Sequence, residues 1–163
     1  MRPLMSFSVL TVSDSCAAGL REDGSGPGII GIMTGAGFTV IERMVVPDGI
    51  ESVASALGKL CGGASLVLTT GGTGLSPRDF TPEATIQVCE RLVPGISEML
   101  RARSAEKVES AWLGRGCAGI SNGSLVVNLP GSVKAVRECL EFLIPLLPHA
   151  LEVLAGDAGR CGG

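Results

Sequence analysis

The sequence is poor in aromatic side chains and has almost no histidine. Phe, Trp and Tyr make up 3% of its 163 residues, Tyr is absent and there is one His. Proteins that bind single-stranded nucleic acid stack bases on aromatic faces along a basic groove, whereas the net charge here is −3. A nucleic-acid partner is therefore disfavoured, and a histidine-rich metal site is excluded.

The sequence also lacks paired cysteines, a leader pattern and long apolar runs. Its six cysteines are scattered without a Cys-x-x-Cys pair, so neither a zinc site nor catalytic thiols are expected. No basic region followed by an apolar run opens the chain, and no stretch is long enough to span a membrane. These absences predict a cytoplasmic protein with reduced thiols and no membrane contact.

What the sequence has in quantity is hydrophobic residues, at 45%, and glycine, at 24 residues. The length suits one domain, predicted over 1–155, with a flexible glycine-rich tail at 156–163. Apolar runs that alternate with helical periodicity predict an α/β fold: a three-layer sandwich with a mostly parallel central sheet and helices on both faces. The expected strands are 7–12, 38–46, 65–68, 111–113 with 117–120, and 125–129; the expected helices are 28–34, 50–60, 81–91, 96–108, 133–143 and 145–154. A hairpin-type turn is expected at 121–124, and Ser132 is the expected N-cap of the helix at 133–143.

A glycine loop follows the strand predicted at 65–68. Three of the four residues 71–74 are glycine, and glycine lets backbone amides approach a ligand closely. Such a nest of N–H groups suits a phosphate. Arg78 adds a cation and Asp79 a carboxylate, which is understandable beside a phosphate only if a divalent metal lies between them. A tight turn is the alternative interpretation of the glycines alone. Thr81 is the expected N-cap of the next helix.

Other polar residues come directly after other predicted strands. Ser13, Asp14 and Ser15 follow the first strand, Asp48 follows the second, and the stretch 130–132 follows the last. Each of these could simply cap a helix or a turn. In an open parallel sheet, however, the carboxyl ends of the strands share one edge, where ligands bind. The sequence therefore predicts a single binding site at that edge.

These motifs together resemble the molybdopterin adenylyltransferases: the MogA-type bacterial enzymes, the G domain of gephyrin and its plant counterpart. Members carry a strand ending in Thr-Thr-Gly-Gly-Thr-Gly, a short Arg-Asp segment and then Thr-Pro-Glu-Ala-Thr, which matches 69–85 here. The stretches Thr-Val-Ser-Asp-Ser at 11–15, Val-Pro-Asp at 46–48 and Asn-Leu-Pro-Gly-Ser at 128–132 agree in the same order. The resemblance covers roughly residues 7–154.

The resemblance implies a molybdopterin-binding fold that transfers AMP from ATP, with Mg²⁺, to the molybdopterin phosphate and releases pyrophosphate. It implies Asp48 and Asp79 as catalytic and metal-binding residues. The residues it implies for binding molybdopterin and ATP are Ser13, Asp14, Ser15, Gly71, Gly72, Thr73, Gly74, Ser76, Pro77, Arg78, Asn128, Pro130, Gly131 and Ser132. It further implies a homotrimer and hand-off of the product to a molybdenum-insertion domain.

Two points leave alternatives open. Family members often have Ser-Arg where this chain has Gly114 and Arg115, so one hydroxyl contact to the pterin is missing. The same fold also serves in modules that bind molybdopterin, or act as scaffolds, without adenylyl transfer. Trp112 is expected to be a core residue.

Overall fold

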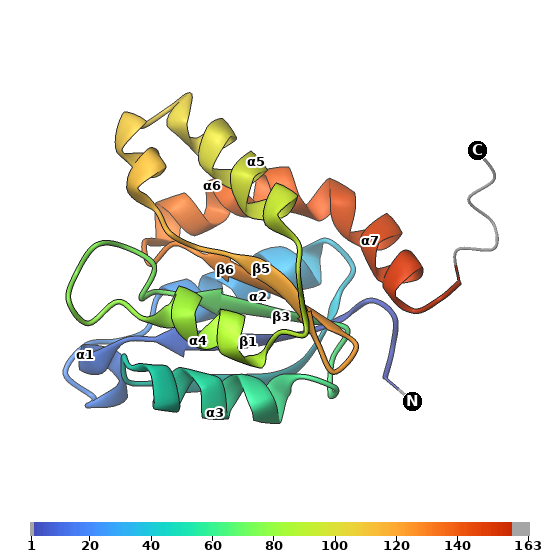
Figure 1. The fold of residues 1–163 in the computed structure, drawn as a ribbon, viewed down its shortest axis with the longest axis horizontal. Helices are drawn as coiled ribbons and strands as arrows, with labels where there is room; N and C mark the ends of the chain where they lie inside the picture. Colours follow the sequence, from blue (N-terminus) through green and yellow to red (C-terminus); the bar gives the residue numbers. More distant parts are fainter. Residues whose placement is uncertain (1, 158–163) are drawn as a thin grey trace.

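The computed structural model describes residues 2–157, which fold into three layers around a six-stranded sheet (Figure 1). The strand order is β2-β1-β3-β6-β5-β4; the first four strands in that order are parallel and the last two pair antiparallel. The strands are β1 (Ser6–Val12), β2 (Thr39–Val46), β3 (Leu66–Thr70), β4 (Arg91–Leu92), β5 (Ala118–Ser121) and β6 (Ser124–Leu129). The predicted fold class is confirmed.

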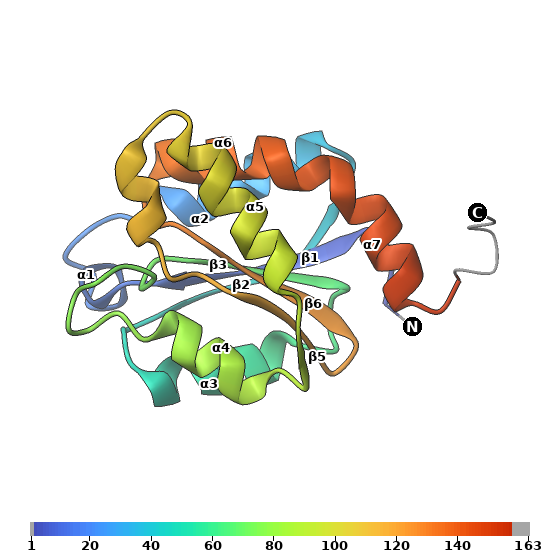
Figure 2. The same cartoon turned by 45° about the horizontal axis from the view of Figure 1, so that its top comes forward.

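Helices cover both faces of the sheet (Figure 2). One face is covered by α2 (Ser25–Gly35), α5 (Pro94–Ala105), α6 (Val133–Leu143) and α7 (Leu147–Leu154). The other carries α3 (Ile50–Leu60) and α4 (Thr81–Val88). The short elements are α1 (Asp14–Ala17) and the 3-10 helices η1 (Glu109–Leu113) and η2 (Ile144–Leu146).

The alternation of side chains along buried strands builds two cores. In β3, Leu66 and Leu68 enter the larger apolar cluster under α2, α6 and α7, while Val67 enters the smaller one under α3 and α4. All three side chains are fully buried, and each contributes about 1.5–3 kcal/mol to folding. The strand that precedes the glycine loop is therefore anchored on both faces, which fixes where the loop begins.

The predicted hairpin is confirmed. Asn122 has φ 47° and Gly123 has φ 72°, the left-handed pair that a tight hairpin between β5 and β6 needs. Arg2 donates hydrogen bonds to the carbonyl oxygens of both turn residues, so the start of the described chain is tied to this end of the sheet.

Several element boundaries differ from the sequence-based expectation. Helix α2 begins at Ser25 instead of residue 28. Helix α4 ends at Val88 because Arg91–Leu92 leave it to pair with β5, and α5 already begins at Pro94, since proline suits the first helical turn. Thr81 is the first residue of α4 and not its N-cap.

The segment predicted as a strand at 111–113 is the 3-10 helix η1. Trp112, expected in the core, is 59% exposed. Apolar residues that line a pocket cannot be distinguished, by sequence alone, from residues of a strand or a core. The helix η1 contributes residues of this kind to a pocket wall. The single domain predicted over 1–155 stays a prediction; of the predicted tail, residues 158–163, including Cys161, lie outside the described residues.

The chain between α1 and α2 is held by one buried carboxylate, Asp23, whose side chain is 5% exposed. It accepts hydrogen bonds from the hydroxyl of Thr11 at 2.7 Å, the amide of Gly26 at 3.0 Å and the guanidinium of Arg43 at 2.7 Å. Burial raises the pKa of Asp23, but these hydrogen bonds outweigh it, so the pKa lies below its ordinary value.

Asp23→Asn is expected to lower the free energy of unfolding by about 1–3 kcal/mol at neutral pH. Because the native pKa is depressed, the stabilisation by the carboxylate is complete above the unfolded-state value, near pH 4, and is lost as pH falls through the native value. Urea unfolding of both proteins between pH 7 and pH 3 checks this. A difference that stays constant over this range, or a similar loss in the exposed control Glu51→Gln, would contradict the assignment.

Candidate functional site

The carboxyl ends of β1, β2, β3 and β6 meet at one edge of the sheet, as the sequence predicts. The amide of Ser13, after β1, donates to the carbonyl of Val46 at the end of β2, at 2.9 Å. The hydroxyl of Thr70, at the end of β3, donates to the carbonyl of Pro130, after β6, at 2.7 Å. The polar motifs that follow these strands therefore share one rim.

The backbone carbonyls of the glycine loop are turned toward the protein. The carbonyl of Gly71 accepts from the Thr81 hydroxyl at 2.9 Å and that of Gly72 from the Thr81 amide at 3.1 Å. Those of Thr73 and Gly74 accept from the backbone amide and Nε of Arg115, both at 2.8 Å. Four consecutive carbonyls are thus anchored, which fixes the orientation of the peptides between them.

The same orientation leaves backbone donors at the surface of the loop. Within the described residues, the amides of Gly72 and Thr73 donate to no protein acceptor, and both residues line a pocket. Gly72 has φ 68°, a left-handed conformation that glycine adopts without strain. Two unpaired N–H groups beside a cavity are able to donate to an anion, which is the role predicted for this loop.

Asp79 lies inside this loop. Its Oδ2 accepts from the amide of Gly74 at 2.9 Å and from the amide of Ser76 at 3.3 Å. The carboxylate therefore closes the loop on itself and takes two of the amides that a phosphate would otherwise bind. This structural role was not expected from the sequence.

Arg115 holds the loop from outside, a role that was not predicted from the sequence. Besides Gly74, its guanidinium donates to the carbonyl of Asp79 at 2.7 Å, and it forms an ion pair with Glu83 on α4. The Arg115 guanidinium holds the pKa of Glu83 below its ordinary value. The glycines on both sides, Gly114 and Gly116, line the pocket and were the only local signal that the segment is irregular.

Arg115→Gln is expected to lower the free energy of unfolding by only about 1–2 kcal/mol, because the side chain is one-third exposed. Its larger effect is on ligand binding, since the carbonyls of Gly74 and Asp79 lose their anchors and the part of the loop next to the Gly72 and Thr73 amides is no longer held in place. Isothermal titration with inorganic pyrophosphate and thermal unfolding on one sample measure both. Arg137→Gln, on α6, is the matched control. Equal effects of the two substitutions would contradict the role of Arg115 in holding the loop.

A second polar cluster joins the turns after β1 and β2. Arg78 donates to both carboxylate oxygens of Asp14, at 2.8 and 3.0 Å, and to the carbonyl of Asp48 at 3.1 Å. The Asp14 and Asp48 segments also exchange hydrogen bonds, each amide donating to the other carboxylate at 3.1 Å. The hydrogen bond from Arg78 holds the pKa of Asp14 below its ordinary value.

Asp48 is different, because its pKa is raised. Burial raises this pKa, and the negative charges of Asp14 and Asp79 raise it further. Together these effects outweigh the hydrogen bond from the Asp14 amide, which lowers the pKa. In the described part of the chain, Oδ1 of Asp48 and Oδ1 of Asp79 accept no hydrogen bond. A cation between them would relieve this repulsion.

The donor set fits Mg²⁺ that is shared with phosphate groups. Residues 2–157 contain no group of three or more His, Cys, Asp or Glu side chains able to hold a metal ion. Mg²⁺ in phosphate-transfer sites is typically bound by one or two carboxylates, with substrate phosphates and water as the other ligands. Asp48 and Asp79 meet that requirement. With the other described residues, they do not form a metal site from protein ligands alone.

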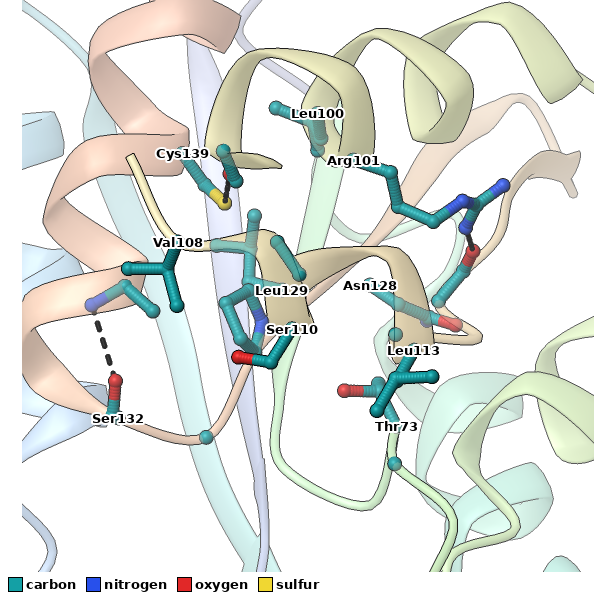
Figure 3. A pocket seen from close by; sticks show the side chains of 18 of the residues that line it. Thr73, Leu100, Arg101, Val108, Ser110, Leu113, Asn128, Leu129, Ser132 and Cys139 are labelled. Carbon is teal, nitrogen blue, oxygen red and sulfur yellow. Dashed lines mark hydrogen bonds between the residues drawn. The ribbon is translucent and has the colours of Figure 1, made fainter. Parts of the chain in front are cut away.

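A pocket of about 760 Å³ opens beside the loop (Figure 3). Its wall combines apolar side chains of α5, η1 and β6, such as Leu100, Leu113 and Leu129, with the polar turns. The predicted site residues that line it are Gly72, Thr73, Gly74, Asp79, Asn128, Pro130, Gly131 and Ser132. A flat ligand with an anionic end fits a cavity of this size and lining.

A shallower hollow of about 470 Å³ contains Asp48 and Arg78. It is close to the pocket, since a Cβ added to Gly72 would lie 3.1 Å from Oδ1 of Asp48. Asp14 does not line the hollow, but it is hydrogen-bonded to both Arg78 and Asp48. Of the predicted residues, Asp48 and Arg78 therefore lie in a second hollow, close to the Gly72 side of the pocket.

The remaining predicted residues have local roles. Ser13 caps α1 by accepting from the amide of Cys16 at 3.2 Å, and its hydroxyl lies 3.2 Å from that of Ser15. Ser132 caps α6, as predicted. Ser76 and Pro77 lie at the exposed end of the loop and line neither hollow.

Asn128 fixes the floor of the pocket. Its Oδ1 accepts from the amide of Cys117 at 3.1 Å, and its Nδ2 donates to the hydroxyls of Thr69 and Thr85, both at 3.0 Å. This buried network joins β3, β6, α4 and the Arg115 segment. The amide is fully used within the protein, so Asn128 shapes the pocket by holding its walls together.

Of the described cysteines, Cys139 lines the pocket, and no chemistry is assigned to any of them. The five described cysteines are free. Burial raises the pKa of the Cys89 thiol to about 12 and that of the Cys117 thiol to about 11, so neither is a thiolate at neutral pH. None of the helices in the described residues is long and apolar enough to cross a membrane.

Comparison with known proteins supplies the family. Residues 8–149 match the family described as "Probable molybdopterin binding domain". A molybdopterin adenylyltransferase of Helicobacter pylori is 40% identical over 155 residues, covering 93% of this chain and 88% of the relative. A molybdenum cofactor biosynthesis bifunctional protein of Synechococcus elongatus is 42% identical over 158 residues, covering 96% of this chain and 50% of the relative.

The fold agrees with solved structures. A molybdopterin biosynthesis protein from Mycobacterium abscessus superposes with a TM-score of 0.88 at 39% identity, covering 94% of this chain and 98% of that one. The chain belongs to the molybdopterin-binding domain family.

Proposed function

We propose that this protein is a molybdopterin adenylyltransferase, as its Helicobacter pylori relative is named. The observation that carries the proposal is the glycine loop, whose four anchored carbonyls leave the amides of Gly72 and Thr73 free between a pocket and the carboxylate of Asp48. A molybdopterin phosphate bound by these amides has its pterin in the 760 Å³ pocket. ATP occupies the adjoining hollow, with Arg78 near its phosphates.

In the reaction, a phosphate oxygen of molybdopterin attacks the α-phosphorus of ATP, and the bond from that phosphorus to the pyrophosphate oxygen breaks. Both reactants are anionic, so the protein must align them and offset their charge. The loop amides hold the attacking phosphate, and Arg78 offsets charge on the other side of the loop. Mg²⁺, held by Asp48 and Asp79, supplies further charge neutralisation when it is bound.

Pyrophosphate release tests the proposal. The purified protein, given ATP, molybdopterin and Mg²⁺, should release one pyrophosphate for each adenylylated molybdopterin formed, and should release none without molybdopterin. Binding of molybdopterin without release would favour the other candidate, a binding module. That candidate has one observation on its side: Asp79 already has a structural partner in the loop amides, so its presence does not by itself indicate chemistry.

Three wider proposals follow from family membership. We propose a homotrimer, a cytoplasmic location and hand-off of the product to a molybdenum-insertion domain. The hand-off is supported by the Synechococcus relative, a bifunctional protein of which this chain covers half. Size-exclusion chromatography with light scattering tests the oligomeric state.

A further inference from the structure

One face of α5 forms a wall of the pocket. Ser97, Leu100, Arg101 and Ser104 all line it, and their spacing of three and four residues places them on the same side of the helix. Leu100 and Arg101 lie across the pocket from Thr73 of the glycine loop (Figure 3). The α5 wall therefore faces the part of a ligand that is farthest from the loop amides.

The polar side chains of this wall have protein partners, with one exception. Arg101 donates to the carbonyl of Gly116 at 2.8 Å, and the Ser104 hydroxyl lies 3.7 Å from Sγ of Cys139. Ser97 is 5% exposed, and its hydroxyl has no hydrogen-bond partner among the described residues. A buried polar atom without a partner costs stability and is rare in folded proteins, so it needs an explanation.

We propose that Ser97 is a substrate-binding residue whose hydroxyl hydrogen-bonds to the polar edge of the pterin ring. The inference rests on the proposed function, because it assumes that molybdopterin occupies the pocket. A serine hydroxyl both donates and accepts, which matches a heterocycle that carries amino and carbonyl groups side by side. A phosphate, in contrast, needs several donors, and these are at the loop. Ser97 thus fixes the ring while the loop fixes the phosphate.

The structure also explains why apolar neighbours accompany this hydroxyl. Leu100 and Leu129 line the same pocket, so a hydrogen bond to Ser97 forms away from competing water. In such surroundings a hydroxyl that is paired only when the ligand is bound discriminates against analogues that lack the matching group. Ser97 is therefore expected to select for the oxygen- and nitrogen-bearing ring edge.

The test compares Ser97→Ala with Ser97→Thr, which keeps the hydroxyl, and with Ser55→Ala, an exposed serine of α3 outside both hollows. Molybdopterin is titrated against the fluorescence of Trp112, the single tryptophan, which lies in η1 between the pocket-lining residues Ala111 and Leu113. Ser97→Ala should raise the Kd, and the KM for molybdopterin, about three- to tenfold, with kcat unchanged. Its Tm without ligand should equal or exceed that of the wild type, since an unpaired hydroxyl is removed. Ser97→Thr should retain more affinity than Ser97→Ala, and Ser55→Ala should bind as the wild type does.

Three outcomes would overturn the inference. A Kd for Ser97→Ala within twofold of the wild type means that water, and not the ligand, pairs with the hydroxyl. A fall in Tm together with the loss of affinity, unrelieved in Ser97→Thr, means that Ser97 acts through packing. If the wild-type protein fails to bind molybdopterin at all, the proposed function fails as well, which separates that result from the other two.

Discussion

Replacing Asp48 with asparagine is expected to lower the rate of adenylyl transfer about a hundredfold or more and to leave the fold intact. A loss of this size is typical when one preorganised stabiliser of a transition state is removed. The Oδ1 of Asp48 accepts no hydrogen bond within the described residues, and its carboxylate is crowded by the charges of Asp14 and Asp79. Removing this charge relieves repulsion, so neither stability nor molybdopterin binding should fall. Single-turnover formation of adenylylated molybdopterin, with a pterin titration on the same sample, measures the two effects.

Asp79→Asn is the informative partner of Asp48→Asn. Because Oδ2 of Asp79 closes the glycine loop through two amides, this variant is expected to lose Tm and pterin affinity along with activity. If both variants behave alike, with activity lost and binding kept, the two carboxylates act together on the chemistry. Normal turnover by Asp48→Asn would show that Asp48 only organises the turn after β2 and would remove it from the catalytic residues.

Adding a single carbon at Gly72 is expected to abolish measurable molybdopterin binding, a loss of at least about a hundredfold. The residue has φ 68°, where a side chain strains the backbone. The new Cβ would also overlap with Oγ1 of Thr81, whose hydroxyl and amide anchor the loop carbonyls. Gly72→Ala must therefore displace the loop, and the two amides that we propose as charge-assisted hydrogen-bond donors to phosphate lose their direction.

Gly58→Ala is the matched control for Gly72→Ala. Gly58 is an exposed residue of α3 with negative φ, and a Cβ there would meet nothing within 4 Å. Alanine is the better helix former, so this variant should gain up to about 1 kcal/mol of stability and bind molybdopterin normally. Equal affinity of both variants for molybdopterin in the Trp112 fluorescence titration would show that the glycine loop is only a turn.

Much of the framework could be predicted from the sequence, because it depends on local patterns. Buried strands such as Leu66–Thr70 are short apolar runs bounded by glycine and polar turns, and the motifs after them converge because parallel strands end at one edge. Asn122 and Gly123 indicated the hairpin through the backbone conformation that they alone adopt easily. The positions of these elements followed from residues that are neighbours in the chain.

What could not be predicted depends on contacts between distant segments. Arg115 binds loop residues more than thirty positions earlier, and nothing in its own neighbourhood indicates those partners. The role of Asp79 in closing the loop was not predicted, because its hydrogen bonds to Gly74 and Ser76 require a loop shape that the sequence does not show. Trp112 was predicted in the core because an exposed apolar residue and a buried one look the same in a sequence.

The parallel pairing of β3 with β6 also determines when the site can form during folding. The paired residues Leu66 and Leu125 are 59 positions apart, and such non-local pairing slows folding because a long stretch of chain must be closed first. A nascent chain that ends at residue 100 already contains the whole glycine motif. It still lacks Arg115, which fixes Thr73 and Gly74, and the strand that supports β3 on one side. Anion binding is therefore expected to appear only once synthesis has passed the turn after β6, so that a truncated chain does not sequester the substrate.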